Sequence, residues 1–296
     1  MTLRALYDVV APAKLNLFLH IVGRRPDGYH LLQSLFVLID WCDTLHFELR
    51  DDGRLTRHDL SAVLPADDLC LRAARALQAA SGCTKGADIS VDKCVPWGAG
   101  MGGGSSDAAS TLLALNRLWG LNWPRARLME LGLRLGADVP FFLGGRNAFV
   151  QGIGEHLTPV TVRAQWLAVI KPAAAIETRA IFSSRLVRRD SEPAILGGSP
   201  KDSFSIENMS AAGRNDLQAA AEAECNEVAQ AARCLGKQFG NSRMTGSGSA
   251  VFARAGWIEG SGAQPATAMP GNMAPDWVGR MCRSLTVHPL VGWTVD

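Results

Sequence analysis

The segment Pro96-Trp-Gly-Ala-Gly-Met-Gly-Gly-Gly-Ser-Ser106 constrains the fold more than any other part of the chain. Five of its eleven residues are glycine, and it lies between a strand-like segment and a strongly helical one. Glycine has no Cβ atom, so such a loop can adopt positive φ angles and turn several backbone N–H groups toward one point. Where a loop of this kind opens a helix, the free N–H groups and the helix dipole form an anion site. The segment therefore predicts that the protein binds a phosphorylated ligand.

The composition narrows the class of protein. The chain has 296 residues, 47% hydrophobic and 20% charged, as expected for one large or two moderate globular domains. Its net charge of +2 gives no field that would favour nucleic acid or a membrane surface. The longest aliphatic run, 35–39, is too short to span a bilayer, and seven scattered cysteines without a CxxC pair argue against zinc and a disulfide framework. We therefore expect a cytoplasmic protein.

Hydrophobic periodicity predicts mixed helices and strands. Alternation from Ala13 to Ile21 puts Leu15, Leu17, Leu19 and Ile21 on one strand face and Lys14, Asn16, Phe18 and His20 on the other. Further strands are expected at Leu31–Asp40, Thr44–Arg50, Ala87–Lys93, Ala148–Gly152, Trp166–Lys171 and Ala250–Ala255. Helices are expected at Leu69–Leu77, Ala108–Trp119, Leu128–Leu135 and Asp216–Leu235, and a last helix and strand close the chain.

This order of elements indicates an α+β fold rather than a repeating βαβ array. The pattern starts again after about residue 160. We therefore expect two domains, residues 1–160 and 161–296, with a ligand cleft between them.

The glycine loop has competing interpretations. Gly98, Gly100 and Gly103 match the G-x-G-x-x-G pattern of a dinucleotide site, but that site needs an acidic residue about twenty positions on, and Leu118–Trp123 offers none. A P-loop would need Lys-Ser or Lys-Thr after the glycines. A flexible linker would not run directly into a helix with Ser105 at the N-cap and small residues in the first turns.

Three segments together resemble a known family, the galactose/homoserine/mevalonate/phosphomevalonate (GHMP) small-molecule kinases. The glycine loop resembles their phosphate loop, Ala11–Leu17 their first motif, and Arg243–Phe252 their third. The resemblance covers essentially the whole chain and also includes Asp27–His30 and Gly136–Pro140. It departs mildly at Ser247 and Ser249, where Thr and Ala are expected, and the Gly/Pro/Ala-rich loop 259–275 has no clear counterpart. It implies the two-domain α+β GHMP kinase fold, with a ligand cleft between the domains.

The resemblance implies an ATP-dependent kinase in which Lys14 and Asp138 are catalytic. Asp138 would be the general base. The sequence around it, taken alone, is equally compatible with an Asp138 that only caps a helix before Pro140. Lys14 would favour the ionised form of Asp138 and approach the transferred phosphoryl group, whereas a lone strand lysine is usually just solvated. Asn16, on the same strand face, would then orient the substrate.

The implied ATP-binding residues form one continuous segment: Pro96, Trp97, Gly98, Ala99, Gly100, Met101, Gly102, Gly103, Gly104, Ser105 and Ser106. ATP chemistry implies Mg²⁺ as well. No acidic pair in the sequence identifies its ligands, and Ser106 is the candidate protein ligand.

The resemblance, which includes Asp27–His30, implies a small-molecule acceptor, a cytidine diphosphate-linked methylerythritol. Tyr29 would stack on the pyrimidine, His30 would hydrogen-bond the base edge, and Phe182 would close the other side, unless these rings are ordinary core packing. Thr178 and the third-motif residues Gly246, Ser247 and Gly248 complete the expected substrate site.

Two other functions stay open at this point. A homoserine or mevalonate type of GHMP kinase would not need Asp27–His30. Inhibition by competing cytidine nucleotides therefore distinguishes it from a kinase that acts on the cytidine-linked acceptor. A dinucleotide-dependent oxidoreductase would bind NADH. The sequence does not distinguish a monomer from a homodimer.

Overall fold

The computed structural model describes residues 3–196, 213–260 and 264–296. Within these ranges a six-stranded sheet has the order β3-β4-β2-β5-β6, and β1 pairs with β2. Its strands are β1 (Ala5–Arg24), β2 (His30–Arg50), β3 (Leu55–Asp59), β4 (Gly86–Asp92), β5 (Ala148–Gln151) and β6 (His156–Pro159). Among the strand pairs of this sheet, only β3 and β4 are parallel. This antiparallel arrangement is not the parallel sheet of a dinucleotide-binding fold.

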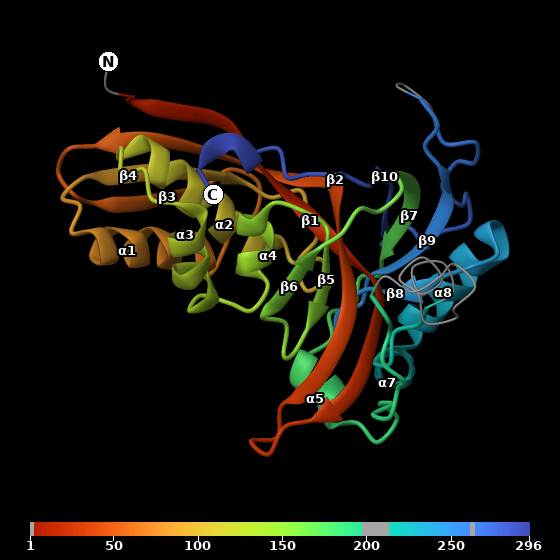
Figure 1. Ribbon diagram of the computed structural model, residues 1–296. Coiled ribbons are helices and arrows are strands. Elements are labelled where there is room, and N and C mark those ends of the chain that lie inside the picture. The colour runs from red at the N-terminus through yellow and green to blue at the C-terminus, as the bar shows by residue number, and fades with distance from the viewer. Residues whose placement is uncertain (1–2, 197–212, 261–263) are drawn as a thin grey trace.

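Helices α1 (Leu69–Ser81), α2 (Gly103–Leu118), α3 (Arg125–Leu133) and α4 (Val139–Gly144) lie together beside this sheet (Figure 1). One buried cluster joins the apolar sides of the helices to the strands, including Leu45, Phe47, Leu77, Leu112 and Phe142. Helix α2 is buried along nearly its whole length from Ser106 onward and packs against β1, whereas its first three residues are not fully buried.

The second half of the chain forms a four-stranded sheet in the order β10-β7-β9-β8 within the described ranges. Its strands are β7 (Gln165–Lys171), β8 (Arg243–Met244), β9 (Val251–Trp257) and β10 (Val278–Arg283). Helices α7 (Gln218–Glu224) and α8 (Asn226–Phe239) pack on it, and α5 (Thr178–Ser183) lies near the far ends of β1 and β2 (Figure 1).

Strands β1 and β2 belong to both halves of the molecule. A buried cluster between the two sheets combines Leu15, Leu17 and Val37 with Leu167 and Phe252. The β1–β2 ladder shifts register between Pro12 and Lys14 and again between Asn16 and Leu19. Bulges of this kind re-aim side chains. Lys14 and Asn16 therefore lie on a short paired segment between two bulges.

The structure corrects several local expectations. The strands expected at Leu31–Asp40 and Thr44–Arg50 are one strand, because Trp41 and Asp43 between them are buried in the sheet. The expected alternation over Ala13–Ile21 breaks at the second bulge, where Leu17 and Phe18 both enter the central cluster.

The carboxyl-terminal third differs in two further places. The helix expected over Asp216–Leu235 is two helices, because Cys225 adopts an extended conformation between them. The last strand, β10, is followed only by the short 3₁₀ turn η1 (Val291–Trp293), so the expected final helix and strand are wrong in their order and type.

The described part of the unusual loop 259–275 lies against α8 and β10. Gln238 Nε2 donates to the carbonyl of Ala268 at 2.6 Å. Met269 and Met273 reach Gly279, where an added Cβ would lie 2.7 Å from Met273 Sδ. The loop therefore covers part of the second sheet. No helix in the described ranges is both long enough and apolar enough to cross a membrane.

After β10 the chain returns to the first half and packs near α2, α3 and α4 (Figure 1). The mostly buried Arg125 holds this terminal segment: Nη1 donates to Leu143 O at 2.6 Å and Nη2 to Val291 O at 2.6 Å. The same guanidinium therefore links the end of α4 to the end of the chain.

We expect Arg125→Ala to lower the free energy of unfolding by about 1–3 kcal/mol, because it leaves buried carbonyl groups without a donor. Urea unfolding measures this change. Arg72→Ala, at an exposed position on α1, is the control and should stay within about 0.5 kcal/mol of the parent. Equal stability of the Arg125 variant and the control would show that the terminal segment is not held by this side chain.

Candidate functional site

The phosphate loop has the conformation that its glycines allow. Gly98, Gly100 and Gly102 all have left-handed φ angles, of 65°, 75° and 72°. Helix α2 begins at Gly103 with Gly102 as its N-cap, so the expected N-cap, Ser105, lies instead in the first turn. The first backbone N–H that bonds within the helix is that of Ser106, which donates to Gly102 O at 2.9 Å. The preceding N–H groups are therefore free to bind an anion.

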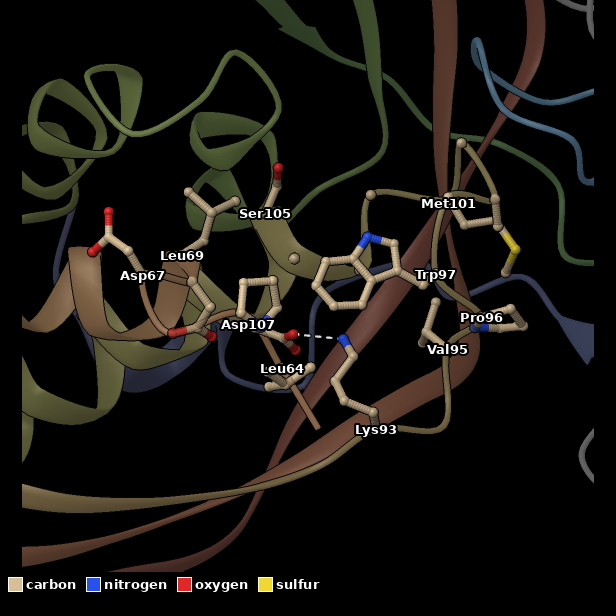
Figure 2. Close-up of a pocket in the computed structure, with 18 residues that line it drawn as sticks. Leu64, Asp67, Leu69, Lys93, Val95, Pro96, Trp97, Met101, Ser105 and Asp107 are labelled. Carbon is tan, nitrogen blue, oxygen red and sulfur yellow. Dashed lines mark hydrogen bonds and ion pairs between the residues drawn. The ribbon is translucent and has the colours of Figure 1, made fainter. Parts of the chain in front are cut away.

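A pocket of about 380 Å³ adjoins this loop (Figure 2). One wall is the loop itself, residues 95–105, and the other is the segment that leads into α1, including Leu64 and Leu69. Lys93 and Asp107 line it between these walls. Its volume lies within the range of small-molecule sites, and its position next to the α2 amino terminus suits a nucleotide.

The expected catalytic pair comes together at the same helix end. Lys14 Nζ lies 3.6 Å from Asp138 Oδ2. Lys14 is only 3% exposed, whereas the Asp138 side chain is 30% exposed. A Cβ added to Gly102 would lie 3.3 Å from Lys14 Cε. Burial lowers the pKa of Lys14 while Asp138 opposes this change. An ammonium group, a carboxylate and free backbone donors therefore share one small region.

Asp138 does occupy the N-cap position of α4, the alternative interpretation of this residue. In the described chain, however, its carboxylate makes no capping hydrogen bond, and its φ and ψ angles, −83° and −16°, are helical rather than extended. A capping residue normally has an extended backbone and accepts from the first turn. The side chain is thus available for the site.

Asn16 connects this pair to the third motif. Its side-chain Oδ1 accepts from Lys14 Nζ at 2.5 Å, and its backbone N–H donates to Thr245 Oγ1 at 2.8 Å. Its Nδ2 donates to Ser34 Oγ at 2.9 Å. Asn16 therefore holds Lys14 in place through Oδ1, while one of the two Nδ2 hydrogens has no partner within the described chain.

The two glycine loops touch through their backbones. A Cβ added to Gly248 would lie 2.1 Å from Gly100 N and 2.2 Å from the carbonyl carbon of Ala99. Ala250 N also donates to Ala99 O at 3.2 Å. Gly246 and Gly248, expected as substrate-binding residues, therefore support the phosphate loop directly.

The expected cytidine residues line a second, larger cavity of about 980 Å³, together with Arg24, Arg179, Arg185 and Arg189. The rings of His30 and Phe182 stack on each other, 5.5 Å apart and 18° from parallel. Tyr29 is 63% exposed. Burial, and to a lesser extent Arg189 and Arg24, lowers the pKa of His30, so its imidazole is neutral near pH 7. A neutral imidazole can both donate and accept hydrogen bonds.

Two contacts connect this cavity with the third motif and with the residue before Asp138. Thr178 Oγ1 and Ser247 Oγ are hydrogen-bonded at 2.8 Å, which joins α5 to the third motif. A Cβ on Gly154 would lie 3.6 Å from Ala137 Cβ, so the β5–β6 turn, whose Ile153 lines the cavity, borders the residue before Asp138. The sequence-predicted residues therefore lie in two neighbouring regions of the molecule.

Sequence reasoning missed a buried charge cluster beneath the phosphate loop. Lys93 Nζ pairs with Asp43 and, at 2.6 Å, with Asp107 Oδ2. Asp43 Oδ1 also accepts from the N–H groups of Cys94 and Val95, the residues that enter the loop. Burial raises the pKa of Asp107 well above its ordinary value, which Lys93 opposes. The sequence does contain a signal for this cluster, because the charged residues Lys93 and Asp107 lie on either side of the glycine loop.

Asn215 was missed as well, and nothing in the sequence marks it. Its Nδ2 donates to Met244 O at 3.0 Å and to Gly246 O at 2.8 Å, while Oδ1 accepts from Leu217 N at 2.9 Å. This buried amide therefore holds the third-motif loop in the position where it meets Gly100.

The residues present also suit a magnesium ion held together with phosphates. Ser106 Oγ is buried and has no hydrogen-bond partner in the described chain. The described residues contain no group of three or more His, Cys, Asp or Glu side chains placed to hold a metal. Mg²⁺ in kinases usually keeps waters and binds phosphate oxygens with few protein ligands, so one hydroxyl at this helix end is compatible with it.

The chain matches two family models, the GHMP kinases N terminal domain over residues 68–146 and the GHMP kinases C terminal over residues 205–259. It is 63% identical to the 4-diphosphocytidyl-2-C-methyl-D-erythritol kinase of Methylibium petroleiphilum over 99% of both chains. It is 55% identical to the enzyme of the same name from Albidiferax ferrireducens, over 99% of this chain and 97% of that protein.

Solved structures agree with these matches. The crystal structure of a 4-(cytidine 5'-diphospho)-2C-methyl-D-erythritol kinase is 33% identical, with a TM-score of 0.69 over 85% of this chain and 90% of that one. A homoserine kinase from Cytophaga hutchinsonii, 16% identical, has a TM-score of 0.66 over 96% of this chain and 95% of that one, and so shares the fold. The expected α+β two-domain fold of the GHMP kinases is confirmed.

We expect Gly248→Ala to weaken ATP binding about tenfold or more, because the new methyl group must push the third-motif loop away from Gly100. Calorimetric titration with ATP measures the effect. Gly271→Ala is the matched control, because its Cβ would meet nothing within 4 Å. Unchanged ATP affinity in the Gly248 variant would mean that the contact between the loops does not shape the nucleotide site.

Proposed function

Because this chain belongs to the GHMP kinases, among the 4-diphosphocytidyl-2-C-methyl-D-erythritol kinases, we propose the following reaction for it. It transfers the γ-phosphoryl group of ATP to the 2-hydroxyl of 4-diphosphocytidyl-2-C-methyl-D-erythritol, giving the 2-phosphate and ADP in the non-mevalonate isoprenoid pathway. The observation that carries this proposal is the pairing of buried Lys14 with Asp138, 3.6 Å apart, at the amino terminus of α2.

The reaction divides among the residues as follows. Bound ATP with Mg²⁺ supplies the phosphoryl group. The free N–H groups at the start of α2 bind phosphate oxygens, with Ser106 Oγ available to the metal. Asp138 accepts or orients the proton of the acceptor hydroxyl. Lys14, held by Asn16, stabilises negative charge on Asp138 and on the phosphoryl oxygens.

The second cavity suits a cytidine diphosphate group. Four arginines around it favour a doubly charged diphosphate, and the neutral His30 can hydrogen-bond to the donor and acceptor edge of cytosine. The exposed ring of Tyr29 offers a stacking face. Since His30 now covers one face of Phe182, a base between Tyr29 and Phe182 requires the imidazole to turn toward the base edge.

The proposed function also implies a cellular compartment and an oligomeric state. The relatives with this name are bacterial metabolic enzymes, and we infer the cytoplasm, where ATP is supplied, as the place of action. The protein acts as a monomer or a homodimer. Light scattering on the purified chain distinguishes the two.

Asp138→Asn should lower kcat by about 10²–10⁴ with little change in either KM, because it removes the charge of the proposed base while keeping its shape. Lys14→Met should cause a similar loss. If the two residues act as one unit, the double variant should be scarcely worse than either single variant. A coupled ADP-release assay with the cytidyl substrate measures all three rates.

Asp51→Asn is the matched control, since this carboxylate is 70% exposed and, among the described residues, pairs only with Arg4 at the surface. Thermal melting of each variant separates folding from catalysis. An Asp138→Asn protein with near-normal kcat would remove Asp138 from the catalytic assignment.

Tyr29→Ala and Phe182→Ala should raise the KM for the cytidyl substrate far more than the KM for ATP, since each removes about 1–3 kcal/mol of stacking. Tyr7→Ala, at a 60% exposed position on β1, is the control. Steady-state kinetics with each substrate varied in turn gives the comparison. Equal changes in both KM values would indicate a general packing defect rather than a cytosine site.

A further inference from the structure

One tryptophan differs from the other seven in its surroundings. Trp41 and Trp119 are buried, and Trp277 packs against the second-half core. The remaining four indoles, apart from Trp97, each lie under an arginine: Trp123 under Arg127, Trp166 under Arg283, Trp257 under Arg163 and Arg254, and Trp293 under Arg117. In the described chain Trp97 has no hydrogen bond, ring contact or arginine contact, and it is 62% exposed.

The free indole of Trp97 belongs to the phosphate loop and lines the 380 Å³ pocket. Figure 2 shows its ring on one side of this space, with Leu64 and Leu69 on the other. The loop that carries it is held on both sides of Trp97. Val95 N donates to Asp43 Oδ1 at 2.7 Å, and Ala99 O accepts from Ala250 N at 3.2 Å. The indole is therefore presented to the pocket by a backbone with little freedom to withdraw it.

We propose that Trp97 is the stacking platform for the nucleobase of ATP, which lies between the indole and the Leu64–Leu69 wall. This inference rests on the proposed function, because it takes ATP as the occupant of the pocket. A free aromatic face opposite an aliphatic wall matches a flat base. The phosphates would then reach the free N–H groups at the start of α2, which border the same pocket.

This arrangement has a specific energetic consequence. Stacking on an aromatic ring depends on the π surface of the base and tolerates different bases. Trp97 should therefore strengthen the binding of ATP and GTP alike, and should contribute nothing to a ligand that has phosphates but no base. Base identity would have to be read by the polar groups of the pocket, not by Trp97.

The test is calorimetric titration of the full-length protein and two variants, Trp97→Leu and Trp97→Phe, with ATP and with inorganic tripolyphosphate. Trp97→Leu should weaken ATP binding about tenfold, the range expected for loss of one base–aromatic stack. It should leave tripolyphosphate affinity unchanged. Trp97→Phe, which keeps an aromatic face, should restore most of the ATP affinity.

Fluorescence provides a second measurement that does not depend on activity. ATP should quench part of the tryptophan emission of the parent protein, whereas tripolyphosphate should not. The ATP-dependent part should vanish in Trp97→Phe. It should persist in Trp257→Phe, whose indole is covered by two arginines.

Failure of this inference is distinguishable from failure of the proposed function. If the parent protein binds neither ATP nor tripolyphosphate, the proposed kinase function is overturned. If ATP binds with equal affinity to the parent and to Trp97→Leu, the site stands but Trp97 does not stack on the base. Equal weakening of ATP and tripolyphosphate would mean that Trp97 shapes the loop instead, which also overturns the inference.

Discussion

Two backbones approach each other where no side chain could be accommodated, and the site is assembled around this contact. Gly100 of the phosphate loop meets Gly248 of the third-motif loop, where an added Cβ would lie 2.1 Å from the Gly100 nitrogen. On the other side of the phosphate loop, Met101 O accepts from Lys14 N at 2.9 Å. The first motif, the phosphate loop and the third motif are therefore joined by main-chain contacts, and the side chains of the site are positioned relative to one backbone unit.

The second constraint is the burial of Lys14. Removing an ammonium group from water is costly unless partners compensate for it. Here the partners are Asp138 at 3.6 Å, the Asn16 amide oxygen at 2.5 Å and the face of Phe36 at 4.5 Å. Since Asp138 remains partly exposed, the pair is open on one side to an incoming anion or hydroxyl. A charge held in this way is more typical of a functional site than of a surface ion pair.

Features that depend on neighbours along the chain could be predicted from the sequence. The strands over 86–92 and 165–171 were expected within about one residue, because their apolar patterns are local. The continuity of β2 was not expected, because an aspartate such as Asp43 is typical of a loop. In the structure its carboxylate accepts hydrogen bonds from the distant Cys94 and Val95. The break at Cys225 and the role of Asn215 also depend on packing against distant segments, which no local pattern records.

The sequence by itself determined that a glycine-rich loop opens a helix, and its three motifs resembled the GHMP kinases closely enough to identify the catalytic candidates. Local backbone preferences depend on residue type, so the loop at the start of the helix could be predicted without a structure. Only the tertiary structure decided that Lys14 pairs with Asp138, that Gly248 supports the phosphate loop, and that His30 stacks on Phe182. It alone showed that Trp97 keeps a free face, because the exposure of a ring is set by whatever the rest of the chain packs beside it.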